Sequence, residues 1–358
     1  MEPPISITEL NDGGQTAESI AAGVVAEITA AERTLDIALY DVRLPGPVGD
    51  DVADAIRAAQ ARGVKVRIAY NADGFFKIPV PPPPSTRPDI LAELGVELKP
   101  IPGEPDLMHH KYVVRDGGAL WCGSTNWTLD SWTREENLIV QVDSPELAAV
   151  YARNFDDLWR KGKVEDSGKW DTTLLPVGDA RVRPWFSPGR GEKLAHRIAE
   201  AIGLATRRVR IASPVLTSGP ILATLAEVGA EQKVDVLGVC DWTQLHAVFG
   251  QWKNNPGSQW KMPLLAGVLE TAHFNGKNST PYAPGRVHDY MHAKVTVADD
   301  IVFVGSFNLS RSGEMNAENV LEIHDAALAD QMTAYIEGVR DRYPDVVPPE
   351  IATARTAV

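Results

Sequence analysis

The sequence predicts an α/β protein made of two duplicated α/β sandwich halves, whose mixed, mainly parallel sheets pack around a pseudo-twofold axis. A short motif containing His109 returns at His292, 183 positions later, and helical and strand-like periods alternate in the same order before each copy. Alternating helices and strands are typical of βαβ units. With 358 residues, 44% of them hydrophobic, the chain is long enough to bury the core of both halves.

Each half is expected to hold a helix, a strand, a second helix, a second strand and a closing helix. In the first half these elements span residues 17–31, 35–40, 51–61, 64–69 and 145–160, and in the second half 193–205, 209–212, 221–228, 234–239 and 326–342. A polar stretch over residues 161–178 joins the halves. We therefore place the two domains at residues 1–170 and 171–358.

Two segments break the symmetry of the repeat. Residues 75–84 hold an apolar start followed by four prolines, which favours an extended loop. Residues 251–286 have no counterpart in the first half and include Trp252 and Trp260. Long segments of this kind are typical of lids, binding loops or solvated excursions.

Composition and charge narrow the classes of partner. The formal net charge of −13 opposes non-specific attraction to nucleic acid and to anionic lipid surfaces, although a local basic groove could override it. Cys122 and Cys240 lie in strand-like runs and are predicted to be buried free thiols. The sequence shows neither a run of about 18 apolar residues nor a secretory signal. We therefore expect a cytoplasmic protein, or a secreted one if a signal had been removed.

The repeated motif carries the chemistry. The first copy runs from His109-x-Lys111 to Gly-Ser-x-Asn126, and the second from His292-x-Lys294 to Gly-Ser-x-Asn308. Each copy reads as a strand, a turn with an aspartate and a returning strand. Side chains alternate along a strand, so the histidine and lysine of each copy face the same way and the returning strand brings the asparagine to them. An imidazole, an ammonium group and a carboxamide on one surface suit a phosphate group.

These motifs resemble the HKD motif of the phospholipase D superfamily, in which His-x-Lys-x4-Asp is followed by Gly-Ser-x-Asn. Asp116 and Asp299 complete that spacing, and Met291–Val320 looks especially similar to bacterial members of the phosphatidyltransferase and cardiolipin synthase type. The resemblance covers residues 10–342. It implies a phospholipase D-like fold and a metal-independent phosphodiesterase that needs no cofactor and acts through a phosphohistidine intermediate.

The resemblance also implies roles for individual residues. His109 is assigned as nucleophile and His292 as general acid and base, with the reverse assignment left open. The phosphoryl oxygens would be held by Lys111, Lys294, Asn126 and Asn308, with Ser124 and Ser306 in support. Asp116 and Asp299 would shape the turns.

A glutamate follows each motif asparagine by ten residues, namely Glu136 and Glu318. The resemblance implies that such a glutamate stands behind a histidine and fixes its tautomer. The equal offsets favour Glu136 over Glu135, which we interpret as a solvated surface charge. His110 is interpreted as packed or exposed, His288 as a loop surface residue, and Trp127 as either core or a substrate-binding pocket wall.

Three functions remain open. The first is hydrolysis of a phospholipid, or transfer of its phosphatidyl group to water or an alcohol, with apolar loops that could contact a membrane surface peripherally. The second is a nuclease with the same site, which the negative charge disfavours. The third is an inactive binding protein that keeps the fold. Because both motifs lie on one chain, we expect a monomer.

Overall fold

The computed structural model describes residues 3–72, 86, 88–281, 283 and 286–346. The first half consists of β1 (Ile5–Leu10), α1 (Ala17–Thr29), β2 (Thr34–Leu39), β3 (Val42–Arg43), α2 (Pro47–Ala61), β4 (Lys65–Ala72), α3 (Pro88–Ala92), β5 (Glu97–Pro102), β6 (Lys111–Arg115), β7 (Ala119–Gly123), β8 (Trp127–Thr128), α4 (Leu129–Thr133), β9 (Asn137–Asp143) and α5 (Pro145–Lys161).

The second half consists of β10 (Leu175–Val177), β11 (Ala180–Phe186), α6 (Gly191–Leu204), β12 (Arg208–Ala212), α7 (Gly219–Glu231), β13 (Asp235–Asp241), α8 (Trp242–Lys253), α9 (Lys261–Thr271), β14 (Phe274–Lys277), β15 (Val295–Ala298), β16 (Ile301–Gly305), α10 (Arg311–Met315), β17 (Asn319–His324) and α11 (Ala326–Arg340). Every helix and strand expected from periodicity is present. The boundary near residue 170 stays a prediction.

Local signals explain where the closing helices begin. Ser144 caps α5 by accepting a hydrogen bond from the Leu147 backbone N–H, and Asp325 does the same for α11 through Leu328. At its end, α5 stops at Gly162, whose φ of 65° suits glycine and closes the helix.

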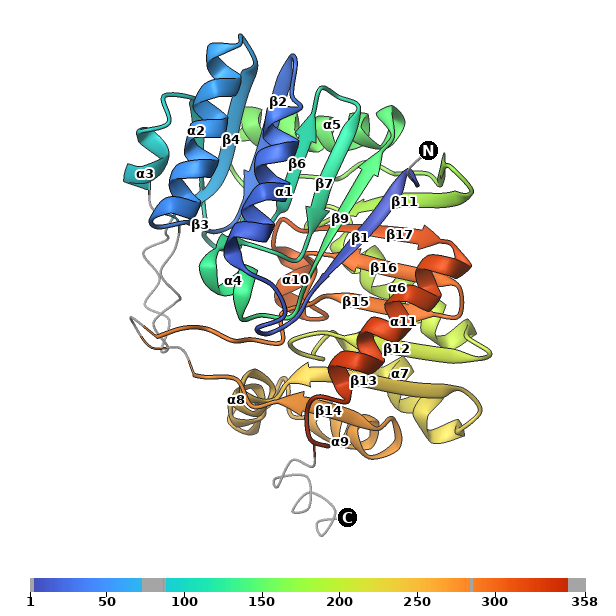
Figure 1. Cartoon of the computed structure of the whole chain (residues 1–358). Coiled ribbons are helices and arrows are strands. Elements are labelled where there is room, and N and C mark those ends of the chain that lie inside the picture. Colours follow the sequence, from blue (N-terminus) through green and yellow to red (C-terminus); the bar gives the residue numbers. More distant parts are fainter. Residues whose placement is uncertain (1–2, 73–85, 87, 282, 284–285, 347–358) are drawn as a thin grey trace.

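The two large sheets repeat one strand order. The first sheet runs β1-β9-β7-β6-β2-β4-β5, and the second contains β17-β16-β15-β12-β13-β14 in the corresponding positions. Figure 1 shows the first sheet in blue to green and the second in yellow to red. The α/β class and the mixed sheets are confirmed. Antiparallel pairs outnumber parallel ones in the two large sheets, however, because each motif hairpin and its neighbours pair antiparallel and, within these sheets, the described strands pair parallel only in β2-β4-β5 and β12-β13-β14.

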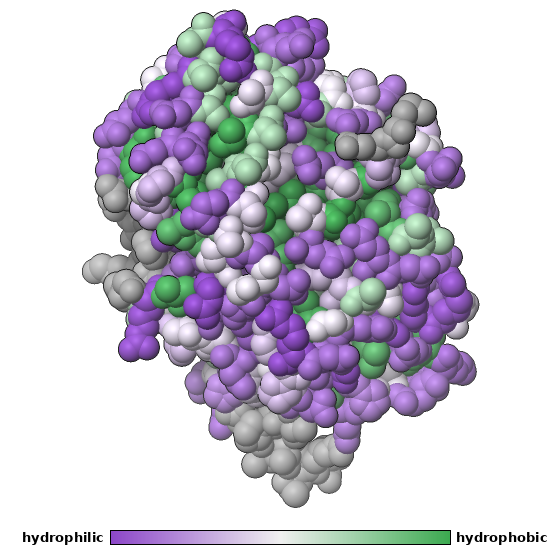
Figure 2. All heavy atoms as spheres, viewed as in Figure 1, coloured by the Kyte–Doolittle hydropathy of each residue, from purple (hydrophilic) through white to green (hydrophobic). Residues whose placement is uncertain are grey.

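Three hydrophobic clusters hold the molecule together. One lies between α1, α2 and the first sheet, and another between α6, α7, α9 and the second sheet. The third is shared: it includes Tyr151 and Phe155 of α5, Met332 and Ile336 of α11, and residues from both sheets. On the face drawn in Figure 2, hydrophilic residues dominate the lower half, and hydrophobic residues show in patches near the band where the halves meet.

The segment at residues 251–286 differs from the expected long loop. It contains the end of α8, all of α9 and strand β14, which extends the edge of the second sheet. Trp252 is buried against Phe249, whereas Trp260 is 51% exposed. The helix forms because Leu265, Val268 and Leu269 recur at helical spacing and bury one face. Residues 75–84, expected to form an extended loop, lie outside the described residues.

Candidate active site

Each motif histidine is anchored to the opposite half. The His109 backbone N–H donates to the Ala317 carbonyl at 2.9 Å, and the His292 N–H donates to the Glu136 carbonyl at 3.1 Å. Both histidines precede the first strand of a hairpin, β6–β7 or β15–β16. The chain thereby brings two motifs that are far apart in sequence to one place between the halves.

The His109 ring is hydrogen-bonded to a carboxylate of the second half. Its Nδ1 lies 2.8 Å from both oxygens of Glu318, whose side chain is fully buried. The ring of Tyr40 packs edge-on against His109 at 4.7 Å between centroids, and the Lys111 ammonium lies 5.0 Å from the centre of the Tyr40 ring. Glu318 therefore takes the position that the sequence predicted for it.

The His292 ring contacts different groups from those at His109. Its Nδ1 lies 3.0 Å from Asn137 Oδ1 and 3.4 Å from Glu135 Oε2. The expectation that Glu136 fills this place is wrong: its carboxylate binds Lys277 Nζ at 2.9 Å and accepts a hydrogen bond from the Tyr343 hydroxyl. Glu135, expected on the surface, is buried and accepts a hydrogen bond from Ser131 Oγ at 2.6 Å.

A shift of one residue explains this correction. Gly123 of β7 pairs with Ile139, and Gly305 of β16 pairs with Val320, so the first-half connection is one residue longer. Asn137 therefore takes the position of Glu318. A one-residue shift moves every side chain to the other face of a strand, which turns Glu136 away from the site. Equal sequence offsets do not identify Asn137 and Glu135 as site residues. The only signal for them is the order Glu-x-Asn at residues 135–137, which reverses the order Asn-x-Glu at residues 316–318.

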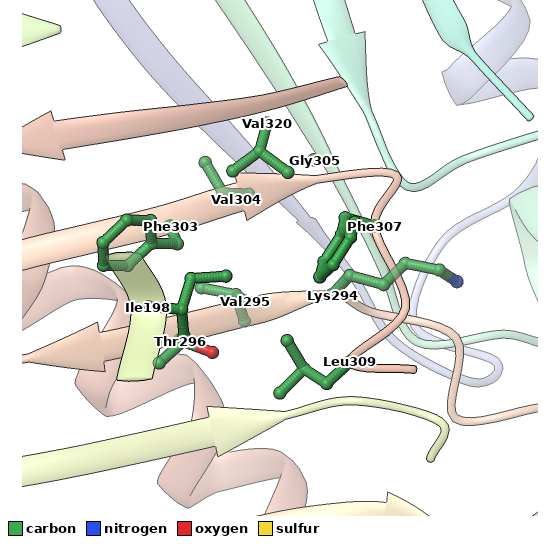
Figure 3. Close-up of a pocket in the computed structure, with 10 residues that line it drawn as sticks. All are labelled: Ile198, Lys294, Val295, Thr296, Phe303, Val304, Gly305, Phe307, Leu309 and Val320. Carbon is green, nitrogen blue, oxygen red and sulfur yellow. The ribbon is translucent and has the colours of Figure 1, made fainter. Parts of the chain in front are cut away.

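Each motif lysine donates a hydrogen bond to the backbone carbonyl of the histidine two residues before it. Lys111 Nζ donates to the His109 carbonyl at 2.9 Å, and Lys294 Nζ donates to the His292 carbonyl. Burial lowers the pKa of Lys111 to about 7 and lowers that of Lys294 well below its ordinary value. Figure 3 shows the Lys294 ammonium extending away from the apolar side chains around Phe303, with Phe307 beside its stem. A bound anion would favour the charged form of both lysines.

The site is buried and rich in titratable groups. Burial first, and then Lys111 and Lys294, lower the pKa of both histidines well below the ordinary value. Burial raises the pKa of Glu318 to about 8 and that of Glu135 to about 7, against the lowering effect of their neighbours. Neutral imidazoles are therefore available in the absence of a ligand. Such imidazoles can act as nucleophiles or bases.

The motif asparagines are placed alike in the two halves. Asn126 Oδ1 and Asn308 Oδ1 are both buried, and neither has a hydrogen-bond partner among the described residues. These oxygens accept hydrogen bonds and could pair only with a donor. The predicted contact of each asparagine with phosphoryl oxygens would have to come from its Nδ2 donor, and it stays a prediction.

The hydroxyls of the motif serines bind the residues behind the histidines. Ser124 Oγ donates to Asn137 Oδ1 at 2.7 Å, and Ser306 Oγ donates to Glu318 Oε2 at 2.6 Å. Both serines are fully buried. Both serines thus hold the residues behind the histidines, and their predicted contact with substrate stays a prediction.

The predicted turn role of Asp116 and Asp299 is confirmed. Asp116 accepts hydrogen bonds from the backbone N–H groups of residues 32–34 at 2.7–2.9 Å. Asp299 does the same for residues 206–208. Both aspartates have positive φ, at 55° and 50°. These bonds tie each hairpin turn to the start of the neighbouring strand, β2 or β12.

The remaining predicted residues lie in packing positions. Trp127 is 2% exposed, packs edge-on against Trp121 and lines a small apolar cavity beneath α2 and α3, so it is a core residue rather than a substrate contact. His110 is fully buried, as one of its two interpretations held. His288, expected on the surface, is 5% exposed and stacks on Tyr290. Cys122 and Cys240 are buried free thiols, as predicted.

Within the described residues, no group of three or more His, Cys, Asp or Glu side chains is arranged to hold a metal ion. None of the described helices is long and apolar enough to span a bilayer.

Comparison with known proteins adds the family. A family model described as "cardiolipin synthase, PLD-like domain" matches residues 24–159 and 198–340. Mitochondrial cardiolipin hydrolase from Chlamydomonas reinhardtii is 28% identical over 130 residues, which are 36% of this chain and 53% of that protein. The chain thus spans about half the length of this curated relative.

Solved structures were also compared. Phosphatidylserine synthase from Haemophilus influenzae Rd KW20 matches with a TM-score of 0.68 and 13% identity, over 98% of this chain and 92% of that one. Nuc from Salmonella typhimurium, a phospholipase D family member, matches with a TM-score of 0.35 and 24% identity, over 44% of this chain and 95% of that one. The first likeness shows a shared fold along nearly the whole chain.

Proposed function

Because the chain belongs to the phospholipase D-like family of the cardiolipin synthase type, we propose that it is a phosphodiesterase that cleaves phospholipids through a phosphohistidine intermediate. One observation carries this proposal. Two buried histidines from opposite halves are each held at Nδ1, by Glu318 or by Asn137, with a lysine beside each. Fixing Nδ1 leaves Nε2 of each ring for chemistry.

The reaction has two steps. In the first, the Nε2 lone pair of His109 forms a bond to phosphorus and the bond to the leaving alcohol breaks. His292 enters this step as the imidazolium, a form that the bound phosphodiester anion favours, and gives the alcohol its Nε2 proton while keeping the proton on Nδ1. In the second, His292 takes a proton from water or an acceptor alcohol, whose oxygen displaces His109 from phosphorus. Lys111, Lys294 and the two motif asparagines would hold the non-bridging oxygens throughout.

A phospholipid is the preferred substrate class. The family match and the name of the curated relative support it, whereas the net charge of −13 opposes binding to a nucleic acid polyanion. Water or an alcohol as acceptor, peripheral membrane contact, a monomeric state and a cytoplasmic location stay predictions.

The test offers cardiolipin or phosphatidylglycerol vesicles and single-stranded DNA in parallel, each with EDTA present. We expect release of a lipid product containing the phosphatidyl group, and an acid-quenched phosphoenzyme after short reaction times. His109→Ala should abolish both. His246→Ala, a change at an exposed histidine of α8, is the matched control and should leave turnover unchanged.

Three outcomes would contradict the proposal. DNA cleavage without lipid turnover would make the chain a nuclease. Loss of activity with EDTA would exclude the metal-independent route. Absence of turnover on every diester, from a protein that folds, would point to a binding protein instead.

A further inference from the structure

The two motif histidines are supported by different chemical groups at equivalent positions. Ser306 Oγ donates to Glu318 and accepts from the Asn319 backbone N–H, at 2.6 and 3.1 Å. Ser124 Oγ donates to Asn137 and accepts from the Leu138 N–H, at 2.7 and 2.9 Å. The same serine contacts thus hold a carboxylate behind His109 and a carboxamide behind His292.

The difference between carboxylate and carboxamide also involves a second residue in each half. Asn137 Nδ2 donates to Glu135 Oε2 at 3.1 Å, and Asn316 Nδ2 donates to Glu318 Oε1 at 3.3 Å. Each histidine therefore faces an Asn–Glu pair, but the order of the pair is reversed. Both oxygens of Glu318 lie 2.8 Å from His109 Nδ1, whereas His292 Nδ1 has the Asn137 oxygen nearest, at 3.0 Å, and a Glu135 oxygen farther away, at 3.4 Å.

The hydrogen bonds fix how the Asn137 amide is turned. Its Nδ2 donates to the Ser131 carbonyl at 3.2 Å as well as to Glu135, so its Oδ1 must face Ser124 and His292. An amide oxygen only accepts hydrogen bonds. His292 must therefore carry its proton on Nδ1, which leaves Nε2 as the reactive nitrogen.

We propose that Asn137, backed by Glu135, is a positioning residue for His292, and that the reversed Asn–Glu order makes the roles of the two histidines non-interchangeable. This inference rests on the proposed function. Bonding of phosphorus to His109 Nε2 creates a cationic ring, which the Glu318 carboxylate neutralises. His292 must instead release and regain a proton in each cycle, and a neutral amide holds that proton less tightly than a direct carboxylate would.

Several charged groups face His292. Lys294 lies two residues after it in the same segment, and Lys111 and His109 face it from the first half, all disfavouring the imidazolium. Glu135 at 3.4 Å favours it. Moving the carboxylate from residue 135 to residue 137 would bring it from 3.4 Å to hydrogen-bonding distance of His292 Nδ1 and so favour the imidazolium more strongly, without changing the net charge.

The decisive variant is the double exchange Glu135→Asn/Asn137→Glu, which copies the pair at residues 316 and 318. We expect it to stay active and to move the alkaline limb of the pH profile of kcat/KM upward by about one unit, with the acid limb unmoved. The mirror exchange Asn316→Glu/Glu318→Asn should lower kcat and move the acid limb instead. An alkaline limb that does not move would make Asn137 merely structural, and movement of the acid limb would reverse the roles.

Two further measurements keep the inference separate from the proposed function. A histidine NMR titration of the protein without substrate should show a raised pKa for His292 alone in the exchange variant, even if no diester is ever turned over. If the exchange variant does not fold, Asn137→Ala decides. We expect kcat to fall roughly 10–100-fold with KM unchanged, and an unchanged kcat would overturn the inference.

Discussion

At the scale of single residues, two adjacent glutamates have unrelated tasks. Glu135 turns toward His292, whereas Glu136 lies in an ionic cluster with Lys277, Tyr343 and, at 3.8 Å, Arg342. Lys277 in turn lies 3.1 Å from Asp12. This cluster ties the start of the chain, the first motif loop and the segment after α11 together, so its contribution belongs to stability rather than to chemistry.

Glu136→Gln should therefore reduce stability, whereas Glu318→Gln should reduce activity. Glu136→Gln leaves the buried Lys277 with Asp12 as its remaining carboxylate partner, which should lower the free energy of unfolding by on the order of 2 kcal/mol. Its kcat should stay near the wild-type value. Glu318→Gln should instead lower kcat at least 10–100-fold, because His109 loses its carboxylate. Chemical denaturation and steady-state kinetics on both variants measure the two effects, and a catalytic defect in Glu136→Gln would contradict this assignment.

The residues that could be predicted are those fixed by local spacing. Strand alternation predicts that His109 and Lys111 lie on the same side, and both contact the Tyr40 ring, although β6 itself begins only at Lys111. The supporting residues Glu135 and Asn137 could not be assigned in the same way. Their roles depend on one additional residue in the connection between β7 and β9, which changes the pairing register and which sequence offsets do not reveal.

At the scale of elements, the turn of each motif hairpin is held by an aspartate that accepts backbone hydrogen bonds. Asp299 binds three backbone N–H groups that precede and begin β12, and Asp116 does so for β2. Burial opposes ionisation of Asp299, but these hydrogen bonds outweigh it and lower its pKa below the ordinary value of 3.8. The hairpin therefore depends on the charged form of the aspartate.

Asp299→Asn should lower the free energy of unfolding at pH 7 by about 1 kcal/mol, because the turn is partly exposed and its bonds are screened. Since the folded-state pKa is lowered, the contribution is present above about pH 4 and is lost as the pH falls through the folded value. The Tm difference from wild type should therefore shrink below pH 4. Asp300→Asn in the same turn, where an exposed ion pair with Arg207 is lost, is the control and should change Tm little at either pH. An equal loss at both pH values would contradict the role of the charge.

Elements were predictable where one face is buried against a sheet, as for α1, α5 and α11. The sequence was less informative over residues 251–286. There the helix α9 has apolar residues around much of its surface, and the short strand β14 is specified by pairing with β13 rather than by its own alternation. The predominance of antiparallel pairs follows from the predicted hairpins, because both strands of each hairpin also pair antiparallel with their outer neighbours.

At the scale of the whole molecule, one hydrophobic cluster belongs to both halves. It joins α5 to residues of the second sheet and α11 to residues of the first, as Tyr335 illustrates by donating its hydroxyl proton to the carbonyls of Leu10 and Asn137. The same interface holds His109 against Glu318 and His292 against Asn137. Separation of the halves would therefore remove the supports of both histidines at once.

The shared cluster predicts a single cooperative unfolding transition for the described fold. Met332→Ala, at a fully buried position of α11 in this cluster, should lower the free energy of unfolding by roughly 2–5 kcal/mol and shift the whole transition. Met315→Ala, at a position 37% exposed, is the matched control and should shift it little. Calorimetry checks this through agreement of the calorimetric and van't Hoff enthalpies. Two resolved transitions, with Met332→Ala moving one of them, would mean that the halves unfold independently and that the site is held by local contacts alone. A single shifted transition would mean that the central cluster and the contacts that support the two histidines unfold together.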